Sequence, residues 1–137
     1  MHKKFIQSRE EVSLLVRTFY GKVRKDDLLG PIFNGIIKDW EEHLELLTDF
    51  WETQLLYKRK YYGNPMMAHV EVDKKVDNTV SEMHFGVWIN LWLHTLDELF
   101  DQNDEVAQIA KNRARHMGTF LYLNLFEARK STPKPKP

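Results

Sequence analysis

The sequence predicts an all-α protein, and three observations lead to that prediction. Apolar residues recur at helical spacing along most of the 137-residue chain. N-terminal capping patterns precede several of these stretches, and no stretch shows the alternation typical of a strand. The length suits one domain with one core. We expect that domain to cover residues 1–130, and we expect residues 131–137, rich in Pro and Lys, to form a disordered tail.

The first predicted helix follows a capping-box pattern made by Ser8 and Glu11. Its apolar stripe stops at the polar run 25–27, and the stripe consists of Val12, Leu15, Val16, Phe19 and Val23. Residues 28–33 are apolar but contain Gly30 and Pro31. That dipeptide favours a corner rather than a long helix.

The second long helix begins after Asp39, with Glu42 three residues further on, and is expected to end after Tyr57. Its main stripe consists of Trp40, Leu44, Leu47, Trp51 and Leu55. A second face of the same helix carries His43, Leu47, Phe50 and Gln54.

A short helix is predicted next, because Asn64 suits a cap and Pro65 suits the first helical position. It would end near residue 70 and would place Met66 and His69 on one side. Residues 71–78 are charged, lack a pattern and are expected to form a loop.

Two long helices complete the prediction. Thr79 and Glu82 open one that runs to about Phe100, and its apolar surface covers more than half of its circumference, which is typical of a central helix. A polar run at 101–104 separates it from the last helix, expected over about 104–129.

Composition excludes several classes of function. The 20 basic and 20 acidic side chains balance, so the electrostatic term that drives nucleic-acid binding is absent. The lack of cysteine removes disulfides, thiolate nucleophiles and cysteine metal clusters, and is compatible with a reducing cytoplasm. No run of apolar residues is long enough for a membrane span, and the start lacks the apolar region of a signal peptide.

The six histidines also restrict the chemistry. None forms a pair at helical spacing, and none has a glutamate three residues before it. Zinc motifs and di-iron helical bundles of the usual type are therefore excluded. A single histidine is still sufficient for a haem, which needs one proximal ligand, an apolar slot and a few polar groups. His69 suits that role, although a lone histidine is more often a surface or core residue.

Four blocks of sequence, in order, resemble the truncated haemoglobins, in particular the bacterial group III branch. Residues 19–34 (FYGKVRKDDLLGPIFN) resemble the second helix and the corner after it. Residues 40–43 (WEEH), followed by Phe50 and Trp51, resemble the distal helix. Residues 62–69 (YGNPMMAH) resemble the approach to the proximal histidine, and Val87-Trp88 resembles the ligand-side tryptophan. The blocks lie between about residues 10 and 125.

This resemblance implies a shortened globin with a two-over-two helical sandwich, a haem b cofactor and His69 as the iron ligand. It also implies a set of residues lining the haem: Phe33, Leu47, Phe50, Trp51 and Met66. Plain core packing is the alternative for each of them. Arg59, with its neighbours Lys58 and Lys60, is a candidate partner of the haem propionates, but a solvated charge run is as good a reading.

On the ligand side the resemblance places Tyr20, His43 and Trp88. Tyr and Trp side chains donate hydrogen bonds, and an oxygen ligand that has drawn electron density accepts them. Two such donors would slow oxygen release, which favours chemistry such as nitric oxide detoxification or peroxide handling over oxygen transport. His43 is either a gate or a solvent-facing side chain. The expected small ligands are O₂, NO and CO, with a reductase as a possible partner.

A second hypothesis from another class fits the helical stripes equally well. The aromatic residues, 12% of the chain, would then fill an ordinary core, and the protein would be a cofactor-free helical interaction module. The ordered blocks around Tyr20, His43 and His69 favour the haem protein.

Overall fold

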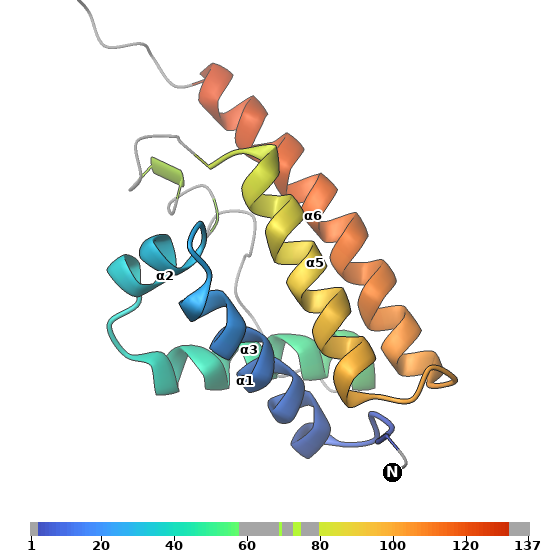
Figure 1. Cartoon of the computed structure of the whole chain (residues 1–137). Helices are drawn as coiled ribbons and strands as arrows, with labels where there is room; N and C mark the ends of the chain where they lie inside the picture. The colour runs from blue at the N-terminus through green and yellow to red at the C-terminus, as the bar shows by residue number, and fades with distance from the viewer. Residues whose placement is uncertain (1–2, 58–68, 70–72, 75–79, 132–137) are drawn as a thin grey trace, which may run out of the picture.

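The computed structural model describes residues 3–57, 69, 73–74 and 80–131, and within them it is all-helical apart from one isolated β-bridge. This confirms the predicted fold class. Figure 1 shows the five named helices: α1 (Arg9–Lys25), α2 (Gly30–Ile36), α3 (Trp40–Leu56), α5 (Glu82–Leu99) and α6 (Glu105–Ser131). Within the part of the chain that is described, no helix is both long and apolar enough to cross a membrane.

The helices form two stacked pairs (Figure 1). α1 packs against α3, and α5 lies antiparallel beside α6. α1 also packs against α5 and thereby joins the two pairs, while α2 follows α1 at a corner. This is the two-over-two arrangement that was expected.

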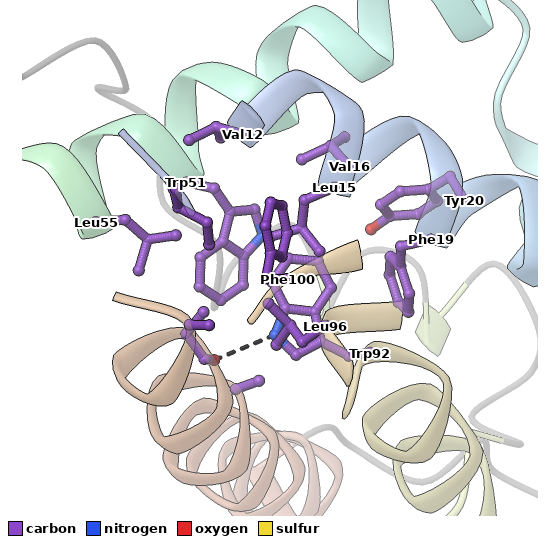
Figure 2. Packing of buried hydrophobic residues seen from close by; sticks show 14 of the residues in the cluster. Val12, Leu15, Val16, Phe19, Tyr20, Trp51, Leu55, Trp92, Leu96 and Phe100 are labelled. Atoms are coloured by element: carbon purple, nitrogen blue, oxygen red, sulfur yellow. Dashed lines mark hydrogen bonds between the residues drawn. The ribbon is translucent and has the colours of Figure 1, made fainter. Parts of the chain in front are cut away.

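The core is built around the aromatic side chains at the crossing of α1, α3 and α5 (Figure 2). Trp92 is fully buried, and its indole N–H donates to the carbonyl oxygen of Ala110 at 3.1 Å. Trp51 stacks on Trp92 with ring centroids 4.4 Å apart, and Phe19 meets Trp92 edge-on at 4.9 Å. Such aromatic contacts add to the burial of apolar surface. They fix α5 against both α1 and α3.

The predicted stripe of α1 is fully buried, which confirms the helical periodicity assigned to it: Val12, Leu15, Val16, Phe19 and Val23. A hydrogen bond ties the segment before α1 to the turn between α5 and α6. The buried amide of Ile6 donates to the carboxylate of Asp104 at 2.7 Å. Asp104 also accepts from the amide of Val106 and so serves the start of α6.

The helix starts are only partly as predicted. Asp39 caps α3 by accepting from the amide of Glu42 at 3.1 Å, as expected. Ser8 precedes α1 but makes no side-chain bond to its backbone, so the predicted capping box is incomplete there. Instead, the Glu11 carboxylate accepts from the Ser8 hydroxyl and from the amide of Gln7, both at 3.1 Å.

The start of α5 differs more clearly from the prediction. The helix begins at Glu82 rather than at residue 79, and Ser81 is its N-cap. His84 completes the cap, because its Nδ1 accepts from the backbone amide of Ser81 at 2.9 Å. An imidazole here performs the role that Glu or Gln usually performs in a capping box. The sequence rule looked for Glu or Gln three residues after the cap and therefore missed the Ser81–His84 box.

The corner after α1, where a corner rather than a long helix was predicted, contains a seven-residue helix, α2. Pro31 lies in its first turn, where the missing proline N–H costs nothing. Gly30 is buried at its start, and the chain turns so tightly that a Cβ on Gly30 would lie 2.7 Å from the backbone oxygen of Arg24.

Gly30→Ala is therefore expected to lower the free energy of unfolding by about 1–3 kcal/mol, because backbone must move to relieve the contact. Gly35→Ala in the same helix is the control, since nothing lies within 4 Å of its added Cβ. Urea denaturation of the two variants measures the difference. Equal unfolding midpoints would contradict the tight approach at Gly30.

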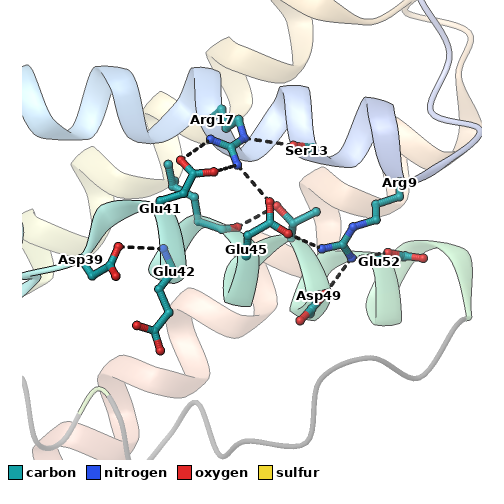
Figure 3. A network of polar contacts seen from close by, with 11 residues as sticks. Arg9, Ser13, Arg17, Asp39, Glu41, Glu42, Glu45, Asp49 and Glu52 are labelled. Atoms are coloured by element: carbon teal, nitrogen blue, oxygen red, sulfur yellow. Dashed lines mark hydrogen bonds and ion pairs between the residues drawn. The ribbon is translucent and has the colours of Figure 1, made fainter.

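Charged side chains hold α1 and α3 in register outside the core (Figure 3). Arg17 donates to both carboxylate oxygens of Glu41, at 3.1 and 2.6 Å. Arg9 donates to Asp49 at 2.7 Å and to Glu52 at 2.6 Å. The Glu52 side chain is only 3% exposed, so its contact with Arg9 replaces contacts with water. These contacts set which residues of α1 face which residues of α3.

Candidate functional site

The structure brings Tyr20 of α1 and His43 of α3 together. Their rings meet edge-on with centroids 6.0 Å apart. Phe33 of α2 lies 5.9 Å from the Tyr20 ring on another side. Two of the three predicted ligand-side residues and one predicted lining residue therefore share one cluster.

Trp88, the third predicted ligand-side residue, reaches the same cluster from α5. It packs edge-on against Phe19 at 5.7 Å and lies parallel to Trp92 at 6.3 Å. Burial raises the pKa of the Tyr20 phenol far above its ordinary value, and a hydrogen bond with Trp88 lowers it by a smaller amount. Tyr20 is therefore a protonated phenol at neutral pH and retains its capacity to donate.

His43 is half-buried, and this burial lowers the pKa of its imidazole. Lowered from a reference value of about 6.5, the pKa leaves the imidazole neutral at pH 7. A neutral imidazole has one donor and one acceptor nitrogen. Tyr20, His43 and Trp88 thus form an uncharged polar group; we name these three residues the distal cluster.

The predicted lining residues fall into two groups. Phe33 and Leu47 are half-buried at the edge of the core. Phe50 and Trp51 are buried, and Trp51 is covered by its stack on Trp92. The alternative of core packing therefore describes Trp51 in this structure, while its contact with a haem stays a prediction.

The proximal side is described only at one position. His69 is helical and half-buried, in keeping with the short helix expected there. Met66 and Arg59, with Lys58 and Lys60, lie outside the described residues, as does most of the predicted short helix. The predicted tail, apart from Ser131, also lies outside them.

The sequence analysis named Trp40 and Arg24 only within apolar stripes or blocks of family resemblance and assigned neither of them a role in the site. The Trp40 ring lies 5.8 Å from that of His43 and 6.1 Å from that of Tyr20. The guanidinium carbon of Arg24 lies 4.4 Å from the centroid of the Trp40 ring, a cation–π contact. One signal was available for Trp40: it precedes His43 by three residues and so shares its helix face.

Comparison with known proteins identifies the family. The chain is 31% identical over 121 residues to the group 3 truncated haemoglobin ctb of Campylobacter jejuni, covering 84% of this chain and 91% of that protein. The chain belongs to the group III truncated haemoglobins. A crystal structure of group III truncated haemoglobin from Campylobacter jejuni superimposes with a TM-score of 0.79 and 29% identity, covering 90% of this chain and 94% of that one. No family model matches the sequence.

Membership of the truncated haemoglobins confirms the shortened globin fold, and truncated haemoglobins as a family bind haem. The residues present fit that cofactor. Five apolar side chains of α3 and α5 pack against the core but are only half-buried: Leu44, Leu47, Val87, Trp88 and Leu91. Their remaining exposed surface is apolar and is available to a porphyrin. The distal cluster adds uncharged polar groups to that surface, and this combination is what a haem pocket needs.

Proposed function

We propose that this truncated haemoglobin binds haem b through His69 and holds a diatomic ligand next to the distal cluster of Tyr20, His43 and Trp88. The observation that supports it most is the convergence of those three side chains from α1, α3 and α5. Phe33, Leu47, Phe50, Trp51 and Met66 are the proposed lining residues, and Arg59 is the proposed propionate partner.

The haem supplies the iron atom at which O₂, NO or CO binds. The chain supplies the rest. Burial keeps the Tyr20 phenol protonated, so its O–H can donate to the ligand, and the indole of Trp88 can only donate. His43, neutral because of its own burial, adds a donor or an acceptor without adding a charge. A site that is uncharged and partly shielded from water has a low local dielectric, which strengthens each hydrogen bond to the ligand.

The expected consequence is slow release of oxygen, because each donor adds to the free energy that dissociation must overcome. Slow release suits chemistry on the ligand better than transport. We propose one of two reactions in the cytoplasm. The first is oxidation of nitric oxide to nitrate by O₂, with one electron from a reductase. The second is reduction of hydrogen peroxide to two water molecules, which takes up two protons and two electrons, the electrons again from a reductase. Rates of nitric oxide consumption by the oxygenated protein, compared with peroxide turnover, distinguish the two.

Haem titration tests the proposal directly. The purified chain is expected to take up one equivalent of haemin and to develop a Soret band, and reduction under CO is expected to shift that band. A chain that stays folded and colourless with excess haemin would refute the proposal. It would favour a cofactor-free helical interaction module instead.

A further inference from the structure

Trp40 lies between the distal cluster and an open surface cleft. On its inner side the Trp40 ring contacts those of Tyr20 and His43, at 6.1 and 5.8 Å. The Trp40 ring also lines a cleft of about 560 Å³ between α1, α2 and the start of α3. The cleft is formed by Gly21, Arg24, Lys25, Asn34, Ile37 and Trp40. One half-buried ring therefore lies between this cleft and the rings of Tyr20 and His43.

Arg24 holds that ring from the cleft side. Its guanidinium carbon lies 4.4 Å from the ring centroid, and its Nε donates to the side-chain oxygen of Asn34 at 3.3 Å. The Asn34 amide in turn donates to the backbone oxygen of Arg24 at 3.1 Å. The guanidinium is thus positioned over Trp40 by α2, while it remains on the exposed side of the molecule.

We propose that Trp40 is a gate through which diatomic ligands pass between this cleft and the distal cluster, and that Arg24 is its latch. The inference rests on the proposed function, since it assigns an entry route to the same site. An exposed cation–π contact is weak, so the closed state is favoured but opens often. A diatomic gas needs only a brief opening, because it is much smaller than the indole ring that must move.

A gate has a kinetic signature that a ligand contact lacks. Within the described residues, the contacts of the Arg24 side chain are with the Trp40 ring and Asn34, not with the three residues of the distal cluster. Loosening it changes the barrier to passage in both directions and leaves the free energies of the bound and free states unchanged. Association and dissociation rate constants for CO must then change by one common factor, and the equilibrium affinity must stay constant.

Arg24→Met removes the cation and keeps an unbranched side chain. In the haem-loaded protein, CO association after flash photolysis is expected to accelerate about two- to fivefold, with the same factor on dissociation. Lys38→Met is the matched control, because it removes the same charge from an exposed residue outside the cleft and is expected to change neither rate. Unchanged rates in Arg24→Met, or a change in equilibrium affinity, would overturn the latch.

Gly21→Met tests the cleft from the opposite direction. Nothing lies within 4 Å of a Cβ added at Gly21, so a side chain there can occupy the cleft without displacing backbone. CO association is expected to slow by at least twofold. Gly35→Met places the same side chain at another open helical glycine that does not line the cleft, and its rates are expected to match the parent protein. Equal rates in the two glycine variants would overturn the route.

A measurement that does not involve the gas checks the motion itself. The chain has four tryptophans, and ¹⁵N-labelled indoles report their N–H exchange individually. Exchange at Trp40 is expected to accelerate in Arg24→Met and not in Lys38→Met. Trp92, whose indole N–H is buried and bonded to Ala110, is the internal reference. If exchange at Trp40 is the same in both variants, the latch is wrong even where haem binding is normal. A chain that takes up no haem refutes the proposed function instead.

Discussion

His69→Ala is expected to abolish stable haem binding while leaving the helical fold intact. The imidazole is the proposed iron ligand, and no alanine side chain replaces that bond. We expect gel filtration to separate the haem from the variant, which then shows no Soret band, whereas the parent protein retains both. Far-UV circular dichroism of the haem-free variant and of the haem-free parent should coincide, because His69 is only half-buried.

Two controls separate ligation from a structural role of His69. His116→Ala removes an exposed histidine of α6 and is expected to retain the haem. His69→Gly with added imidazole is expected to recover haem binding, since the free base can supply the missing nitrogen. Haem retained by His69→Ala with an unchanged spectrum would transfer the ligand role to another residue.

Tyr20→Phe is expected to retain haem and to increase the oxygen dissociation rate constant by about ten- to a hundredfold. The change removes only the hydroxyl, and a hydrogen bond worth ~1.4–2.8 kcal/mol corresponds to that factor. The ring contacts with Phe33 and His43 need no hydroxyl, so the cluster should stay packed. Stopped-flow displacement of oxygen by CO measures the rate.

The matched control is Tyr122→Phe, which removes a hydroxyl from a tyrosine that packs on Phe85, between α5 and α6. Its oxygen release is expected to equal that of the parent. An equal rate in Tyr20→Phe as well would remove Tyr20 from the ligand side and leave the fold and the His69 prediction untouched. The result expected for Tyr20→Phe also differs from that expected for Arg24→Met. Loss of the Tyr20 hydroxyl lowers the equilibrium affinity for the ligand, whereas loss of the Arg24 cation leaves that affinity unchanged.

The sequence by itself determined the four long helices, α1, α3, α5 and α6, and most of the faces they bury. The α1 stripe is buried as its periodicity required, and Asp39 caps α3 as its spacing from Glu42 indicated. Both are interactions within one or two turns of a single helix, so the local order of residues is enough to specify them. The ordered blocks of sequence likewise sufficed for the family.

Only the tertiary structure decided which side chains from different helices meet. Tyr20 meets Trp88 because α1 crosses α5, and Arg24 covers Trp40 because α2 turns the chain back toward α3. The burial that lowers the pKa of His43 and the stack that covers Trp51 depend on the same crossings. Crossing positions follow from the packing of whole helix surfaces, to which many residues contribute, and no local spacing in the chain encodes them.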